Sequence, residues 1–255
     1  MSPILSSFGG ASARGYRGRR QASGMQYVGY NGNGSGGGVA YTVSLTSGFF
    51  GSGGRTPQVG DFLMAIHGVA TNAGGDLSLS IQTPGFTKLA DIYSPATYSS
   101  HVAISYQFIT GSVPSTITVN GAGGSQGAQS CNLYVIRGVN TTTPFDVTFT
   151  STTSTGITWD PPAITPVTPG AWIVVGGFIA GELGPNNPGF SPPGDLVNLT
   201  GWGVPSFSSP PYGGQRGGMF TSWTSGSYNP GAWTPSYTAT TASSWCAVTM
   251  ALRPA

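Results

Sequence analysis

Residues 61–69 read DFLMAIHGV, and residues 170–178 read GAWIVVGGF. Both are short apolar runs that contain β-branched and aromatic residues, and Gly, Pro and Thr lie just before each of them. Apolar runs of this length between turn signals are typical of buried strands rather than of helices. The two runs therefore indicate a central strand that occurs once in each half of the chain.

Further segments on both sides of residues 61–69 alternate in polarity with a period of two. Clusters of Gly, Pro, Asn and Ser separate them, and no segment shows a convincing helical period with caps. The expected strands of the first half are VAYTVSL (39–45), DFLMAIHGV (61–69), FTKLADIY (86–93), HVAISYQFI (101–109), STITVN (115–120) and NLYVIRGV (132–139). This spacing predicts an all-β fold, an antiparallel, jelly-roll-like β-sandwich.

The second half of the chain repeats the first. Aligning Arg137 with Arg253 brings Cys131 within one position of Cys246, and the strand-like segments follow one another in the same order. We predict an internal duplication, with pseudo-repeats at about 39–150 and 157–255. One sandwich in which the halves pack together is favoured over two small domains, because an isolated five-strand half would leave its edges exposed.

The composition is unusual in its charge. Only 6 % of the residues are charged, against roughly 25 % in an ordinary soluble domain. The net charge is +2, and 42 residues are Gly and 20 are Pro. A neutral surface of hydroxyl and backbone groups has weak self-repulsion, which favours association. This composition suits a subunit of an assembly better than a free enzyme.

Residues 1–38 are rich in Gly and Arg, and we predict that they form an extended N-terminal anchor arm before a sandwich at 39–255. The arm carries four of the nine basic residues, Arg14, Arg17, Arg19 and Arg20, and the first 24 residues contain no acid. Such an arm can bind an acidic protein surface. The body offers no basic stripe that would continue it, so we do not expect nucleic acid as the partner.

Motifs that resemble catalytic or cofactor sites lack the context that their chemistry needs. Residues 32–37 match GxGxxG, but a strand pattern follows where the dinucleotide fingerprint requires a helix. Ser125 lies in a GxSxG match, yet both histidines, His67 and His101, precede it in the chain. These two histidines lie in expected strands that could be neighbours, but two ligands alone do not make a metal site. We therefore predict no catalytic residues, no cofactor and no metal.

Residues 181–218 form a long Gly/Pro/Asn-rich segment that carries Phe190, Trp202, Phe207 and Tyr212. A segment of this length is usually functional or disordered. The aromatic rings could fold back on the sandwich, form a subunit interface or stack on a glycan. Cys131 and Cys246 could pair, or each could be a small buried apolar residue. No secretory signal and no apolar run long enough to span a membrane is visible.

The order GDFLMAI, GFTKLADI, ISYQFITGS, STITV and LYVIRGVNTTTPFD, followed by a second round that ends in WCAVTMALRPA, resembles a Gly/Ser/Thr-rich β-sandwich family. The family recurs in bacteriophage and prophage structural proteins and in bacterial surface proteins, and the resemblance covers roughly residues 39–255. Its most telling pieces are the strand and turn YVIRGV-TTPFD and the terminal ALRPA. SFGGASARGYRG near the N-terminus resembles glycine-rich anchors of phage fibre and tail proteins.

The resemblance implies a fold and a setting, and it brings no catalytic residues with it. We expect a virion protein that is assembled in the bacterial cytoplasm, either a fibre or tail component or a capsid-decoration protein. Its expected partners are other virion proteins, through the arm, further copies of itself and a host-surface glycan. The alternative is a carbohydrate-binding module.

Overall fold

A computed structural model describes residues 24–36, 38–71, 75–121, 128–156, 158–181, 197–198, 212–222, 225–232 and 244–255. These residues form antiparallel strands and one short 3-10 turn, η1 (Ser52–Gly54). The prediction of an all-β sandwich is confirmed. None of the described segments is a helix that is long and apolar enough to cross a bilayer.

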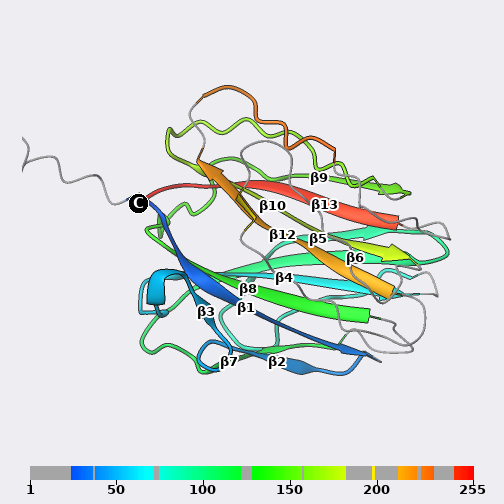
Figure 1. Ribbon diagram of the computed structural model, residues 1–255, viewed down its shortest axis with the longest axis horizontal. Coiled ribbons are helices and arrows are strands. Elements are labelled where there is room, and N and C mark those ends of the chain that lie inside the picture. Colours follow the sequence, from blue (N-terminus) through cyan, green and yellow to red (C-terminus); the bar gives the residue numbers. More distant parts are fainter. Residues whose placement is uncertain are drawn as a thin grey trace, which may run out of the picture.

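Two large sheets and one small sheet make up the described part of the protein (Figure 1). The first sheet has the order β3 (Phe50–Gly51), β1 (Gln26–Gly36), β8 (Ala128–Arg137), β4 (Phe62–Thr71), β6 (Ser99–Phe108), β5 (Thr87–Ser94). The second has the order β11 (Val197–Asn198), β12 (Tyr212–Ser222), β10 (Trp172–Gly181), β13 (Ser244–Leu252), β9 (Thr150–Thr155). β2 (Tyr41–Ser44) pairs with β7 (Thr116–Val119) in the small sheet.

The two large sheets share one strand order. In the first, β5-β6-β4-β8-β1 follow one another, and in the second β11-β12-β10-β13-β9 do so in the same chain sequence. The register agrees as well, because Phe62 of β4 lies opposite Ile136 and Trp172 of β10 lies opposite Leu252. Each sheet is thus built from one continuous half of the chain. β3 and the β2–β7 sheet belong to the first half alone among the described residues.

The same turn introduces the central strand of each half. The Asp61 amide donates to the Gln58 carbonyl over 3.1 Å, and the Ala171 amide donates to the Thr168 carbonyl over 3.0 Å. The glycine inside each turn, Gly60 or Gly170, has a positive φ, 92° and 84°. Only glycine adopts this conformation without steric cost, which explains why a Gly precedes both apolar runs.

The arm boundary predicted at residue 38 is wrong, because residues 26–36 form β1 and pair with β8 along its whole length. The glycines of this strand are typical of a linker in sequence, but packing requires them. A Cβ on Gly29 would lie 2.7 Å from the Phe49 ring. A Cβ on Gly32 would collide with the Asn132 amide. Residues 1–23 lie outside the described residues.

Each of the two large sheets is covered on both faces. One apolar cluster lies between the large sheets and draws on both, with Phe62, Ile66 and Tyr134 on one side and Phe178 and Met250 on the other. The small sheet covers the outer face of the first sheet, at the bottom of Figure 1. Residues 158–164 cover the outer face of the second sheet, where the buried Trp159 indole donates to the Cys246 carbonyl over 3.0 Å. β4 is therefore buried throughout.

Where β4 packs on β10, large and small side chains alternate reciprocally at corresponding positions of the two halves. Ile66 packs over Gly176, where a Cβ would lie 2.7 Å from its Cδ1 atom. The ring of Phe178 packs over Gly68, where a Cβ would collide with it. Since Ile66 corresponds to Gly176 and Gly68 to Phe178 in the two halves, each half supplies one bulky residue and one glycine.

We expect Gly68→Ala to destabilise the protein by about 2 kcal/mol or more, because the new methyl group overpacks the core against a ring. Urea unfolding measures this loss. Phe178→Leu in the same chain should recover part of it, so the two changes should be non-additive. Gly75→Ala is the matched control, since its Cβ meets open space. Equal losses from Gly68→Ala and Gly75→Ala would contradict the packing.

Candidate functional site

Each half ends in an arginine that is paired with a buried carboxylate. Arg137, at the end of β8, binds Asp61 through Nε at 2.8 Å and Nη2 at 3.0 Å. Arg253, just after β13, donates from Nε to Asp146 at 3.1 Å and from Nη2 to the Asp146 carbonyl at 3.2 Å. The guanidinium groups are partly exposed, whereas both carboxylates are buried.

The two carboxylates take the same place although they come from different segments. Asp61 Oδ2 accepts from the Gln58 amide at 2.9 Å, and Asp146 Oδ2 accepts from the corresponding Thr168 amide at 3.0 Å. The second half has Ala171 where the first has Asp61, so Asp146 replaces that carboxylate from the segment between the repeats. Burial by itself would raise the pKa of Asp146, but hydrogen bonds from Thr168, Val167 and Arg253 lower it below its usual value.

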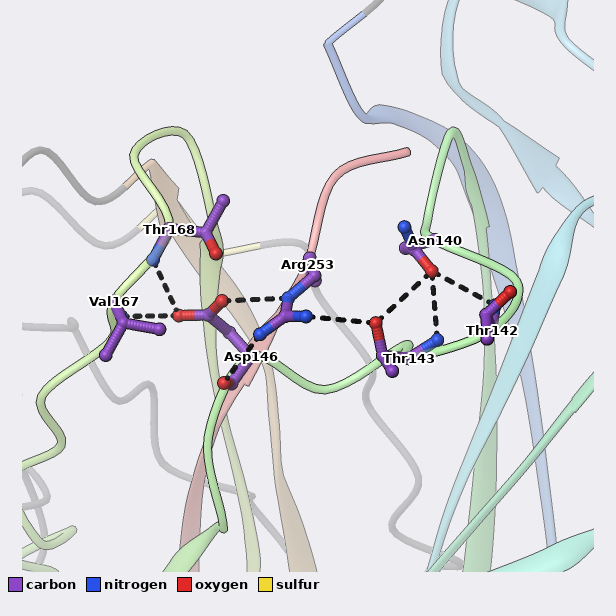
Figure 2. A network of polar contacts seen from close by, with 7 residues as sticks. All are labelled: Asn140, Thr142, Thr143, Asp146, Val167, Thr168 and Arg253. Atoms are coloured by element: carbon purple, nitrogen blue, oxygen red, sulfur yellow. Dashed lines mark hydrogen bonds and ion pairs between the residues drawn. The ribbon is translucent and has the colours of Figure 1, made fainter.

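The segment RGVNTTTPFD and the terminal ALRPA meet in this network (Figure 2). The Asn140 side chain accepts from the amides of Thr142 and Thr143 at 3.0 Å and 2.9 Å, which closes the turn of RGVNTTTPFD. Arg253 of ALRPA donates to the Thr143 hydroxyl at 3.0 Å. The motifs are therefore structural, since they tie the segment between the repeats to the last strand.

Asp146→Asn should lower the free energy of unfolding by about 2 kcal/mol, because it weakens charge-assisted hydrogen bonds to Arg253 and to two amides. Urea unfolding at neutral pH measures this. Asp160→Asn, at an exposed position, is the control and should stay within about 0.5 kcal/mol of the parent protein. If the two variants are equally stable, the network does not stabilise the fold.

A neutral polar cluster lies on the outer face of the first sheet, beneath β2. His67 and Gln129 are buried there, Cys131 lies opposite His67, and the Tyr41 ring meets the His67 ring edge-on at 6.2 Å. Burial lowers the pKa of His67 to about 4, with the Gln129 side chain opposing the shift and the Lys88 charge adding to it. Burial raises the pKa of the Cys131 thiol. At neutral pH the pair is uncharged, and Cys131 is not a thiolate nucleophile.

The second histidine also lies on this outer face. β4 and β6 are neighbours, as the sequence suggested, and His101 lies opposite Val69, next along the strand face to His67. Its Nε2 atom is 3.0 Å from the Gly75 carbonyl, and its ring lies 4.3 Å from that of Tyr93. The part of the chain that the structure describes contains no group of three or more His, Cys, Asp or Glu placed to hold a metal.

We predict that His67 makes the protein acid-labile between pH 6.5 and 4. The unfolded chain binds a proton near the ordinary value of 6.5 and the folded chain only near 4, so stability falls as the pH falls through this window. The loss should approach roughly 3 kcal/mol at the lower end. Urea unfolding of wild type and His67→Gln at pH 7 and pH 4.5 measures it. Parallel pH profiles would contradict the prediction.

Cys131 and Cys246 are both buried and unpaired. Cys131 lies on the outer face of the first sheet, whereas Cys246 lies in the cluster between the sheets, beside the Ser100 hydroxyl at 3.3 Å. Burial raises the pKa of Cys246 to about 12. Of the two alternatives left open by the sequence, the structure shows small buried residues and no disulfide.

A pocket of about 620 Å³ opens at the end of the first sheet where β3 and η1 lie. Its floor is apolar, with the buried Leu45 and the partly buried Phe49 and Val113, and the exposed Arg55 lies at its rim. The remaining lining residues are Thr46, Gly51, Gly54, Thr56 and Pro57. This pocket is not among the sites predicted from the sequence. A signal was present in Arg55, an isolated cation in a body with very few charges.

The residues predicted as sites fall mostly outside the described part of the chain. Arg14, Arg17, Arg19 and Arg20 do so, as do Phe190, Trp202 and Phe207. Tyr212 is the first residue of β12 and pairs with Gly181, so it lies in a strand and not in a loop. Residues 32–36 of the GxGxxG match lie in β1 and are extended. A phosphate-binding loop requires a tight turn at these glycines, so this match is not such a loop.

The fold and these sites define a duplicated antiparallel β-sandwich in which an arginine–carboxylate network ties the end of the last strand of each half to the turn before its central strand. No family model, curated protein or solved structure matches the chain.

Proposed function

We propose that the chain is a non-enzymatic structural protein of a bacteriophage virion, a fibre, tail or capsid-decoration component. In this proposal the N-terminal arm anchors it to other virion proteins, and the sandwich projects for assembly with further copies and for contact with the host surface. The setting rests on the sequence resemblance. The main structural support is the uncharged edge strand β9.

β9 reads TSTTST and ends the second sheet, with β13 as its only pairing partner among the described strands. It contains no charge and no proline, and its register with β13 has no bulge. Natural proteins usually protect an exposed edge with one of these features, because unpaired amides and carbonyls recruit other strands. Among the described residues, the Ser94 hydroxyl of β5 donates to the Ser154 carbonyl of β9 over 3.2 Å, and the Thr150 hydroxyl of β9 donates to the Ala163 carbonyl over 3.0 Å.

The overall charge supports association as well. Charged residues make up 6 % of the chain, so little electrostatic repulsion opposes contact between copies. Three of the described cations are held in ion pairs with Asp61, Asp91 and Asp146, which leaves still less free charge on the surface. A subunit whose exposed strand can pair with another copy needs such a surface.

A carbohydrate-binding module is the second candidate, and the pocket beside Arg55 favours it. The pocket has the apolar floor and the few polar rim groups that small-ligand sites share. The two candidates differ in their first test: an assembly protein forms an oligomer in solution, whereas a binding module works as a monomer.

We expect the full-length protein to be a homo-oligomer by light scattering, and expect the oligomer to survive deletion of residues 2–20. Thr153→Lys with Thr155→Lys should give monomers, because charges on an edge strand block strand addition. Thr165→Lys, exposed and outside any strand, is the matched control and should leave the oligomer intact. A monomeric wild-type protein would overturn the assembly proposal, and an oligomer unaffected by the β9 lysines would exclude this edge.

The anchor has its own test. In phage particles, the protein without residues 2–20 should fold normally but be missing from the virion, because the Arg/Gly arm is proposed to bind neighbouring proteins through forked hydrogen bonds to carboxylates. Normal incorporation of the truncated protein would show that the arm is not the anchor.

A further inference from the structure

We propose that the pocket beside Arg55 binds a saccharide that carries a carboxylate, a sugar of the uronic-acid class. This inference deepens the surface contact in the proposed function and rests on that function for its biological setting. The pocket lies in a part of the fold that the second half lacks among the described residues, it is lined by apolar side chains, and its cation, Arg55, has no carboxylate partner among the described residues.

Most of the pocket is built from segments that only the first half has among the described residues. Leu45 and Thr46 follow β2, Phe49 and Gly51 flank or belong to β3, Gly54 ends η1, and Val113 precedes β7. Neither β3 nor the β2–β7 sheet has a counterpart in the described part of the second half. Thr165 stands there at the position that corresponds to Arg55. The shared strands are sufficient for the fold, so the pocket is an addition to it.

The floor offers a fixed aromatic surface. Phe49 is only partly buried, and its ring lies so close to β1 that a Cβ on Gly29 would come within 2.7 Å of it. Leu45 and Val113 pack in the same outer cluster. A ring held in this way can stack against the apolar face of a sugar at a small entropic cost.

The wall next to the ring is held by the ion pair of the first half. Arg137 Nη2 donates to the Thr56 carbonyl over 3.3 Å, and Asp61 holds the Gln58 amide. The Gly60 amide donates to the Ile109 carbonyl over 2.9 Å. These contacts fix the segment that carries Arg55 on its C-terminal side, so the pocket is preorganised for its ligand.

Arg55 is the cation at this rim, and it differs from the other Lys and Arg side chains that the structure describes. Lys88, Arg137 and Arg253 each bind a carboxylate of the chain, at 2.6, 2.8 and 3.1 Å. Arg55 donates only from Nη1, to the Ser52 carbonyl at 2.9 Å. The other N–H groups of its guanidinium can bind the carboxylate of a ligand through two parallel hydrogen bonds. A single cation matches one negative charge better than a doubly charged phosphate.

Titration of the full-length protein with glucuronic acid, followed by amide chemical shifts in NMR, tests the inference. We expect saturable shifts in residues 45–57 and 113, with weak affinity. Glucose lacks the carboxylate and acetate lacks the ring, so each should bind at least about tenfold more weakly. Arg55→Gln should weaken glucuronic acid by about tenfold and leave glucose unchanged. Phe49→Leu should weaken both sugars but not acetate.

Lys88→Gln is the matched control, because it removes a cation of the same sheet that is already paired with Asp91. It should leave the affinity for glucuronic acid unchanged. No saturation up to about 20 mM ligand, equal affinity for glucose and glucuronic acid, or wild-type affinity in Arg55→Gln would overturn the proposal. Acetate that binds as tightly as glucuronic acid would overturn the assignment to a sugar.

The outcome is independent of the assembly test. If glucuronic acid does not bind while the protein remains an oligomer, this inference fails and the structural role stands. If a monomeric protein binds glucuronic acid through Arg55, the inference stands and the carbohydrate-binding module replaces the assembly proposal.

Discussion

The contact of Ile66 with Gly176 and of Phe178 with Gly68 constrains the rest of the sandwich. Because the two halves meet at corresponding positions of β4 and β10, identical residues there would leave either a void or a clash. Each half has instead kept one large side chain and one glycine, in opposite order. This difference between the halves lets β4 and β10 pack closely at corresponding positions without a void or a clash.

Close packing on the inner face has a consequence for the outer faces. The central strands are apolar on both sides, so each sheet needs a second cover, and the two halves provide it differently. The first half uses β2 and β7, whereas the second uses the segment that carries Trp159. The divergent parts of the repeats thus lie outside the shared strands. The Arg55 pocket lies among them, between the β2–β3 connection and the segment that follows η1.

Strands such as β4, β6 and β8 could be predicted from sequence because period-two patterns and apolar runs are local signals. β1 could not be predicted, since its glycines resemble those of a linker until their partners are known: Phe49 fills the space beside Gly29, and the Asn132 amide fills the space beside Gly32. Asp146 could not be matched to Asp61 either, because it lies before its repeat and reaches the turn only in three dimensions. The pocket was missed for the same reason, since it needs residues 45–57 and Val113 together.

Sparse charge makes the position of each charge informative. In an ordinary domain, many surface ions overlap and screen one another, so a single unpaired arginine has little significance. Here three described cations fasten strands or turns, and Arg137 also holds the Thr56 carbonyl beside Arg55. Among the described residues, no carboxylate forms an ion pair with Arg55. A neutral surface that favours association would, in this way, also give one rim residue the ability to select an anionic ligand over a neutral one.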